Sequence, residues 1–242
     1  MRLKHEIRHL VHHFGIDVVR YPLRDPLART VKLLKHHGIT SVVDVGANDG
    51  GFATAIRGHG YAGRIISFEP LQRPFATLSD KARGDDRWDV RQLAIGDIGA
   101  EVTINVSGNA GLSSSVLPML DSHVAVAPDS RYVGTETARQ VSLDEALPGL
   151  GVDTGSRTFL KVDVQGYEHA VLDGAEKLLA NGTITGLQLE LSLVPLYGGA
   201  MTYREGLDRA ERLGMTLMGL DPVFADPDTG QLLQADAVFF AA

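Results

Sequence analysis

The sequence predicts an α/β protein built on a mostly parallel β-sheet, and three observations support this fold class. From residue 40 onward, short apolar segments alternate with segments of helical periodicity. The apolar segments are continuous runs rich in Val, Ile and Leu, which is typical of strands buried on both faces. A cluster of small residues follows the first of these runs, where sheets of this kind bind their ligands.

Two helices are predicted before the first strand. Apolar residues recur at helical spacing over 3–14, which predicts an amphipathic helix. Asp25 is expected to cap a second helix over 26–37, because Pro26 suits the first helical position and a glycine follows the end. The predicted organisation is an N-terminal helical extension, 1–38, and a main domain, 39–242.

The main domain then continues as alternating strands and helices. Each expected strand is a short apolar run, and each expected helix has an apolar face or ends at a glycine. The expected strands are 41–45, 64–70, 88–96, 158–166 and 184–195, and the expected helices are 50–60, 73–83, 167–180 and 203–214. Residues 215–224 and 232–240 are expected to pair as a closing antiparallel hairpin.

One region interrupts the alternation. EVTINVSG (101–108) alternates like a half-exposed strand where a helix is expected, and 108–118 is loop-like. Residues 119–138 are polar and irregular, which predicts a mobile lid. Residues 139–147 predict a strand followed by a short helix that Ser142 caps.

Composition excludes several classes of function. The chain has no cysteine, so disulfide scaffolds, thiolate metal sites and cysteine nucleophiles are excluded. No apolar run approaches the ~20 residues of a membrane span, and the N-terminus lacks the apolar core of a signal peptide. A cytoplasmic enzyme is the expectation.

Charge divides the chain into two unlike parts. Residues 1–37 hold eight Lys/Arg and three Asp/Glu, a formal +5, whereas the remainder holds 15 basic and 27 acidic residues, a formal −12. An acidic main domain argues against a nucleic-acid substrate. The basic, His-rich head suggests peripheral contact with an anionic membrane; its alternative is a solvated helix packed on the main domain.

The turn in VVDVGANDGGFA (42–53) predicts a ligand without phosphate. A dinucleotide fingerprint needs glycine where Asn48 stands, and a phosphate loop needs a lysine after Gly50 or Gly51. The D-x-G-x-x-x-G spacing that begins at Asp44 is instead typical of S-adenosylmethionine sites. Glycine allows the close backbone approach that this cofactor needs, and a carboxylate suits its ammonium group.

The ends of the next two strands add to this prediction. Glu69 is placed to accept both ribose hydroxyls, and Pro70 follows it to hold it in position. Ala94 and Ile95 are expected to flank an adenine, with Asp97 accepting a hydrogen bond from its amino group. Each signal is weak alone, but their order and spacing together favour a nucleoside cofactor.

These motifs and three later ones resemble the FkbM-type S-adenosylmethionine-dependent methyltransferases over roughly residues 40–242. The resemblance implies a class I, Rossmann-like fold whose seven-stranded sheet has the order 3-2-1-4-5-7-6. It also implies O-methylation of a sugar or polyketide-type hydroxyl. The matching segments are VVDVGANDGGFA (42–53), SFEP (67–70), LAIGD (93–97), FLKVDVQGYEHAVLDGAE (159–176), LQLELSLVPLY (187–197) and DPVFADPDTGQLLQADAVFF (221–240). The candidate cofactor-binding residues are Asp44, Gly46, Ala47, Asn48, Gly50, Phe52, Glu69, Pro70, Ala94, Ile95, Asp97 and Asp163.

Methyl transfer to a hydroxyl requires a group that removes the proton. Asp163 is the first candidate, because it ends the fourth parallel strand, and Glu190 lies near the end of the adjacent strand. The two carboxylates together are a candidate Mg²⁺ site, although no third ligand stands beside Glu190. His169 is a second candidate base, and Gln165 is a candidate contact to the substrate. Trp88 and Tyr197 are candidates to stack on a sugar ring.

Three alternatives stay open. The motifs do not separate an O-methyltransferase from an N-methyltransferase or from an enzyme that methylates a small metabolite, because acceptor choice lies in the loops. A non-catalytic cofactor-binding module is the second alternative, and a nicotinamide dehydrogenase, disfavoured by Asn48, is the third. The expected partner is a glycan or small-molecule acceptor; the sequence indicates no oligomeric state.

Overall fold

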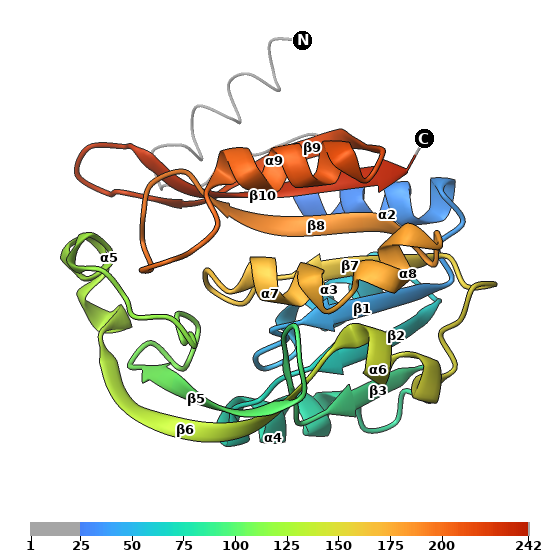
Figure 1. The fold of residues 1–242 in the computed structure, drawn as a ribbon, viewed down its shortest axis with the longest axis horizontal. Coiled ribbons are helices and arrows are strands. Elements are labelled where there is room, and N and C mark those ends of the chain that lie inside the picture. The colour runs from blue at the N-terminus through green and yellow to red at the C-terminus, as the bar shows by residue number, and fades with distance from the viewer. Residues whose placement is uncertain (1–24, 242) are drawn as a thin grey trace, which may run out of the picture.

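The main sheet has seven strands, as expected (Figure 1). In a computed structural model, which describes residues 25–241, they are β1 (Ser41–Val45), β2 (Arg64–Phe68), β3 (Trp88–Arg91), β7 (Thr158–Val162), β8 (Ile184–Ser192), β9 (Met215–Ala225) and β10 (Leu232–Ala241). Their order is β3-β2-β1-β7-β8-β10-β9. Counted along the chain within this sheet, that is the predicted 3-2-1-4-5-7-6. All neighbouring strands are parallel except at β10, which is antiparallel to both β8 and β9.

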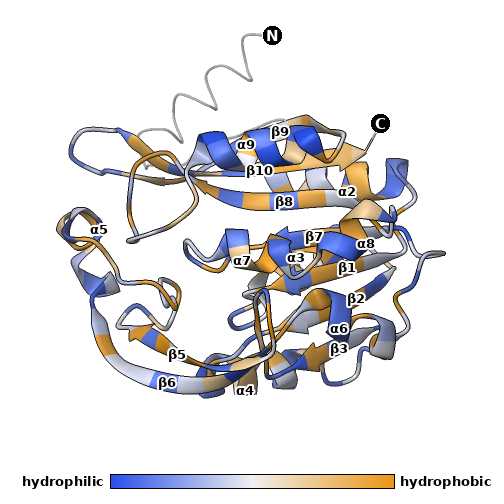
Figure 2. Ribbon diagram, in the orientation of Figure 1, coloured by the Kyte–Doolittle hydropathy of each residue, from blue (hydrophilic) through white to orange (hydrophobic). Residues whose placement is uncertain are grey.

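Helices cover both faces of this sheet, because successive side chains of each strand point to opposite faces. In β1, Val42 packs in one apolar cluster with α2 (Pro26–His36), α3 (Gly51–Gly58) and α4 (Gln72–Ala82). Val43 and Val45 pack in a second cluster on the other face. The helices of the second face are α6 (Leu143–Ala146), α7 (Glu168–Asp173), α8 (Glu176–Ala180) and α9 (Tyr203–Arg212). Figure 2 shows the hydrophobic residues gathered in the strands and hydrophilic ones along α9.

Capping side chains define several helix starts. The Asp25 carboxylate accepts a hydrogen bond from the Ala28 amide at 3.0 Å, so α2 begins where it was predicted. The predicted Ser142 cap is also present, with the Glu145 amide as its donor. At α9, Thr202 and Glu205 form a reciprocal capping box. The predicted helix over 3–14 lies outside the described residues.

The region 119–138 is not irregular, so that prediction is wrong: part of it belongs to a second, small sheet, and its role as a mobile lid stays a prediction. This sheet has the order β4-β6-β5, and its strands are β4 (Ala94–Ile95), β5 (Ala100–Ser107) and β6 (Tyr132–Val141). Residues 132–138 belong to β6, and α5 (Asp121–Val126) precedes it with a short 3-10 turn, Pro128–Ser130. Polar residues are frequent in β6 because one face of this strand is exposed. Figure 1 shows the curved β5–β6 pair at the left of the view.

Two further boundaries differ from the prediction. Residues 88–96 are not one strand: β3 belongs to the main sheet, whereas β4 pairs with β6. Residues 167–180 form two helices, α7 and α8, that meet at Gly174. A Cβ at Gly174 would lie 2.0 Å from the Gly96 carbonyl oxygen, so the backbone of the second sheet passes directly against this break. Between residues 25 and 241, no helix is long and apolar enough to cross a membrane.

Candidate active site

A cavity opens at the carboxyl ends of β1, β2 and β7, as expected for a sheet of this kind. It encloses about 700 Å³ of empty space, part of which is open to solvent. The second sheet and its loops close one side through Ile104, Leu112 and Ser115. The sequence-predicted residues that line the cavity are Gly46, Asn48, Glu69, Pro70, Ala94, Ile95, Asp163 and Gln165.

The glycine turn is held by contact between two strand ends. Gly46 has φ +77°, and a Cβ there would lie 1.9 Å from the Asp163 carbonyl oxygen. The Asp163 amide also donates to the Val45 carbonyl at 3.1 Å. Only glycine fits at this point, since a side chain would meet the Asp163 backbone and push β1 and β7 apart.

Glu69 is fixed by the backbone of two turns. Its carboxylate accepts hydrogen bonds from the amides of Asn48, at 2.8 Å, and Leu71, at 2.9 Å. It is 5% exposed, and burial raises its pKa to about 7 although both amides act to lower it. The carboxylate therefore faces the cavity in one fixed orientation, as a ribose-binding acid requires.

Asp44 lies behind the cavity rather than in its wall. It is fully buried, and its carboxylate lies 3.4 Å from the ammonium of Lys161, its register partner on β7. Burial raises the pKa of Asp44, and Lys161 acts in the opposite direction. The same ammonium lies 3.3 Å from Asp163. Of the two acids beside Lys161, Asp163 is the one presented to the cavity, and its side chain is 32% exposed.

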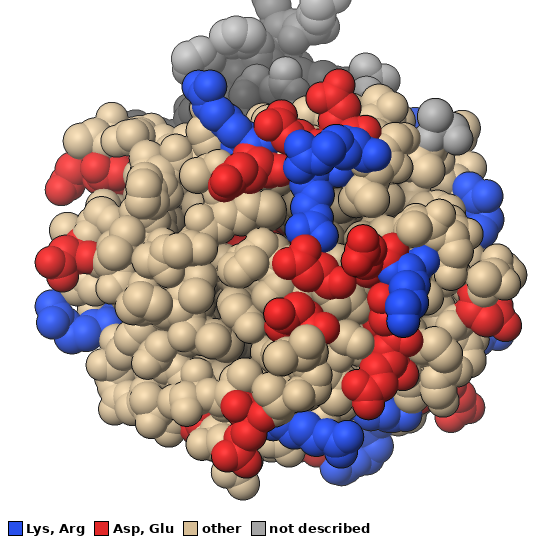
Figure 3. Space-filling model, in the orientation of Figure 1, with Lys and Arg blue, Asp and Glu red and all other residues tan. Residues whose placement is uncertain are grey.

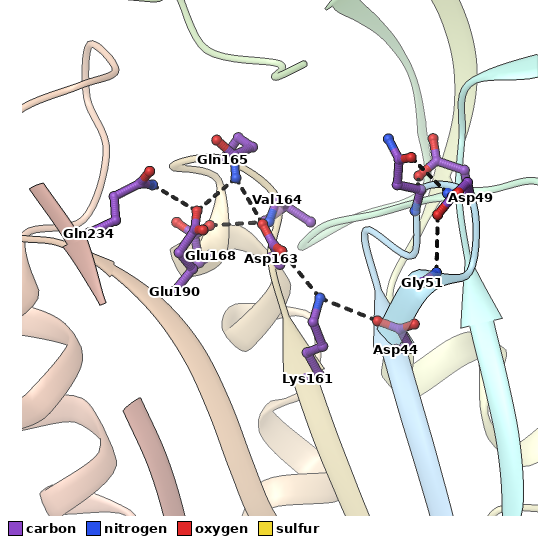
Figure 4. A network of polar contacts seen from close by, with 12 residues as sticks. Asp44, Asp49, Gly51, Lys161, Asp163, Val164, Gln165, Glu168, Glu190 and Gln234 are labelled. Atoms are coloured by element: carbon purple, nitrogen blue, oxygen red, sulfur yellow. Dashed lines mark hydrogen bonds and ion pairs between the residues drawn. The ribbon is translucent and has the colours of Figure 1, made fainter. Parts of the chain in front are cut away.

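Asp163 is joined to Glu190 through one amide (Figure 4). The Gln165 Nε2 donates to Asp163 Oδ1 at 2.8 Å and to Glu190 Oε2 at 2.7 Å. Gln234 donates to the same Glu190 oxygen at 2.7 Å. Burial raises the pKa of Glu190 well above its ordinary value, and the charge of Asp163 acts in the same direction. The hydrogen-bond partners of Glu190 are therefore side-chain amides.

The turn after β7 is closed by Glu168. Its buried carboxylate accepts from the amides of Val164, at 3.2 Å, and Gly166, at 3.1 Å. Gln165 and Gly166 both have left-handed backbones, with φ +55° and +97°. A left-handed glutamine is unusual, and such strain persists only where its surroundings impose it.

The remaining sequence candidates lie away from the cavity. Ala47 and Phe52 pack toward the core of the main sheet, and Gly50 fits against Leu78 and Trp88. Asp97 is exposed and accepts from the Ile98 amide, and His169 contacts the Tyr167 ring. Neither Asp97 nor His169 lines the cavity. Their roles stay predictions.

Trp88 and Tyr197 are not sugar-stacking residues, so that prediction is wrong. Trp88 is 8% exposed and donates its indole N–H to Ser67 at 3.0 Å. Tyr197 is 2% exposed, and its hydroxyl lies 2.7 Å from Gln165 Oε1. Both rings therefore support the turns of the site from behind.

Sequence reasoning missed four residues of this network. Lys161 and Asp236 are charged residues inside otherwise apolar strands, FLKV and ADAVFF, and a charge in such a run is a usable signal of a buried ion pair. Gln234 and the hydroxyl of Tyr197 gave no such signal. Burial acts to lower the pKa of Lys161, but Asp163, Asp44 and Asp236 outweigh it, so its pKa is raised and it stays charged.

The cavity residues fit S-adenosylmethionine, which is a cation with a nucleoside. Fixed carboxylates at Glu69 and Asp163 stand beside the apolar side chains of Leu71, Ala94 and Ile95. The fit for Mg²⁺ is poorer. Within residues 25–241, no group of three or more His, Cys, Asp or Glu could hold a metal. Lys161 and Gln165 already occupy the space beside both candidate ligands.

We expect the ligand-free protein to lose stability as the pH rises from about 5 to 8. Burial raises the pKa of Glu69 and Glu168 to about 7 and that of Asp236 to about 6. The folded state therefore binds more protons than the unfolded state in this window, so its free energy of unfolding falls as pH rises. Each pKa unit corresponds to ~1.4 kcal/mol, and urea unfolding at several pH values measures the loss. Glu168→Gln should flatten the profile; a stability that increases with pH would contradict the prediction.

Sequence comparison identifies one family. The model described as "Methyltransferase FkbM domain" matches residues 44–218. No curated protein matches the chain.

Comparison with solved structures finds distant similarity. The methyltransferase domain of bacterial CtHen1-C is 12% identical, with a TM-score of 0.48 and coverage of 89% of this chain and 96% of that one. A putative S-adenosylmethionine-dependent methyltransferase from Listeria monocytogenes is 9% identical, with a TM-score of 0.48 and coverage of 89% and 98%. The Burkholderia thailandensis 1,6-didemethyltoxoflavin-N1-methyltransferase, solved with bound 1,6-didemethyltoxoflavin and S-adenosylhomocysteine, is 11% identical, with a TM-score of 0.45 and coverage of 99% and 87%.

Proposed function

Because this chain belongs to the FkbM methyltransferase family, we propose that it is an S-adenosylmethionine-dependent O-methyltransferase. Its acceptor is a hydroxyl of a sugar, in a glycoside or glycolipid, or of a polyketide-type product. The observation that carries the proposal is the partly exposed Asp163 carboxylate in the cavity wall, at the end of β7 and beside the Lys161 ammonium. A hydroxyl must lose its proton for methylation, and this carboxylate is the base available to it.

The side chains divide the work of such a reaction. When bound, the cofactor supplies the electrophilic methyl group. Glu69 holds the ribose, and Leu71, Ala94 and Ile95 cover the adenine. Asp163 accepts the acceptor's proton while the second sheet, through Ile104 and Ser115, keeps water from that side of the cavity.

The distribution of charge supports an uncharged acceptor. In Figure 3, the part of the face over β5 and the neighbouring loops carries few charged side chains, whereas Lys, Arg, Asp and Glu gather over the helices of the main sheet. Leu112, at the cavity, is 61% exposed, and Val133, on β6, is 71% exposed. A neutral glycan or polyketide surface suits this region better than a polyanion, which the formal −12 of residues 38–242 would repel.

We expect S-adenosylmethionine to bind the purified protein and NAD not to bind, as measured by calorimetric titration. Glu69→Gln should weaken S-adenosylmethionine binding by about tenfold or more, because a charged hydrogen bond contributes roughly 1.5–3 kcal/mol. The exposed Glu176, in α8, provides the control variant Glu176→Gln. Binding of NAD, or an unchanged affinity in Glu69→Gln, would contradict the proposal.

Methyl-transfer assays then distinguish the acceptor classes. Deoxysugar glycosides and polyketide alcohols should accept the methyl group, whereas primary amines should not. Transfer to amines alone would favour the N-methyltransferase alternative, and binding without any transfer would favour the non-catalytic one. The Mg²⁺-dependent version, with Asp163 and Glu190 as ligands, predicts loss of activity with EDTA; full activity in EDTA removes it.

A further inference from the structure

Gln165 is the point at which the polar contacts behind the cavity converge. Its two amide hydrogens face two different acids, Asp163 and Glu190. Its side-chain oxygen lies 2.7 Å from the Tyr197 hydroxyl, and its backbone carbonyl accepts from Ser115 Oγ at 2.7 Å. With 8% of its surface exposed and every polar side-chain atom engaged by protein, Gln165 has no donor left for substrate.

The backbone of Gln165 shows that this arrangement is imposed. Its φ of +55° places a non-glycine residue in the left-handed region, beside Gly166 at +97°. Such a conformation is strained for a residue with a Cβ. Glu168, through the Val164 and Gly166 amides, and Ser115, through the Gln165 carbonyl, hold the turn in this shape. The side chain is thereby directed at the two acids.

The amide can adopt only one orientation here. The oxygens of both acids accept hydrogen bonds from the Nε2 end, which is the only donor of this side chain. The Tyr197 hydroxyl then donates to the Oε1 end. Reversal of the amide would set its oxygen against both carboxylates, and the buried Tyr197 hydroxyl favours the observed orientation from the other side.

We propose that Gln165, oriented by Tyr197, is the positioning residue that makes Asp163 and Glu190 act as one pair and aims Asp163 at the acceptor hydroxyl. This assignment rests on the proposed function in one respect, the use of Asp163 as the base. One nitrogen holds an oxygen of each acid, so the two acids are coupled: a proton on one changes the charge that the other faces. Gln234 anchors Glu190 from β10, which leaves Asp163 as the member open to the cavity.

Other charged groups lie around Asp163 and Glu190. Lys161 on β7 faces Asp163, and Glu168 on α7 and Asp236 on β10 both add negative charge near Glu190. Burial, together with these acids, raises the pKa of Glu190. Glu190 is thus the buried member, whose pKa is raised, and Asp163 is the member that lines the cavity beside the Lys161 ammonium.

The test uses the full-length protein without ligand. Carboxyl-carbon NMR of Asp and Glu side chains follows the titration of both acids in wild type, Tyr197→Phe, Gln165→Met and Tyr61→Phe. Tyr61→Phe is the matched control. Tyr61 is also buried, but it lies in the core cluster that contains Val42, and its hydroxyl contacts a backbone carbonyl. We expect coupled titrations of Asp163 and Glu190 in wild type, and midpoints shifted by about half a pH unit or more in both site variants, by loss of one or two hydrogen bonds.

A second readout is kinetic. With an accepted hydroxyl substrate, Tyr197→Phe should lower kcat about fivefold to tenfold, which corresponds to the loss of one hydrogen bond. The acidic limb of the pH profile of kcat should shift, and the KM for the acceptor should not change. Folded Tyr197→Phe and Gln165→Met proteins that titrate like wild type would overturn the assignment. If the midpoints shift as expected but the protein binds no S-adenosylmethionine, the pairing of the two acids stands and the proposed function is overturned.

Discussion

Lys161→Met should lower the free energy of unfolding by roughly 3–5 kcal/mol at pH 7, the cost of breaking a buried ion pair from one side. The ammonium of Lys161 lies between Asp44 and Asp163, at 3.4 and 3.3 Å. Asp44 is fully buried, and neither of its carboxylate oxygens accepts a hydrogen bond from the described residues. Methionine fills similar volume but leaves this acid without a counter-charge. Urea unfolding of the ligand-free protein measures the loss.

Two variants make this result specific. Lys81→Met breaks a surface ion pair with Asp49, whose side chains are 36% and 50% exposed, so it should cost less than about 1 kcal/mol. Lys161→Met combined with Asp44→Asn should recover most of the lost stability, because no unpaired charge then remains buried. The loss should also shrink at lower pH, as Asp44 takes up a proton. A cost for Lys161→Met no greater than that for Lys81→Met would show that the buried pair is not the cause.

Asp163→Asn should reduce turnover by about 10²–10⁴-fold while leaving S-adenosylmethionine affinity within about tenfold, the range expected for removal of a general base. Asparagine has the same shape and still offers Oδ1 to the Gln165 amide. It has no basicity, so the acceptor hydroxyl keeps its proton. Formation of S-adenosylhomocysteine with an accepted substrate gives turnover, and calorimetry gives affinity.

Asp173→Asn is the matched control for this substitution. Asp173 ends α7, its side chain is 51% exposed, and it pairs with Arg209 away from the cavity. Its removal should change turnover by less than about twofold, as expected for a surface pair. Wild-type turnover in Asp163→Asn would remove Asp163 from the chemistry.

Much of the fold was predictable because buried parallel strands are continuous apolar runs. SVVDV and TFLKV identify the two central strands, β1 and β7, and glycines mark most of the helix ends. The second sheet was not predictable in this way. Its long strand β6 has one exposed face and reads YVGTETARQV, which has few apolar residues to mark it as a strand. Pairing with β5 and β4 supplies the stability that its composition does not.

The candidate site was predictable at positions where the geometry permits only one type of residue. Gly46 is required because the Asp163 backbone leaves no room for a side chain there. Glu69 comes directly after β2, at the strand end where a ribose-binding acid is expected. The role of Asp44 was misjudged, because its partner Lys161 lies 117 positions away in the sequence and only the strand register brings the two together. Contacts such as Tyr197 with Gln165 depend on the path of a loop, which local sequence does not determine.

The second sheet lies in the chain between β3 and α6, and it packs on the main domain through an apolar cluster around Leu71, Ala94 and Ile104. Its strands take no part in the strand order of the main sheet. An inserted segment of this kind can be exchanged as a cassette where the packing at its junctions with the main domain is kept. In this chain the cassette forms one wall of the cavity, so a graft of residues 96–141 from a relative offers a route to altered acceptor choice that leaves the cofactor turns in place.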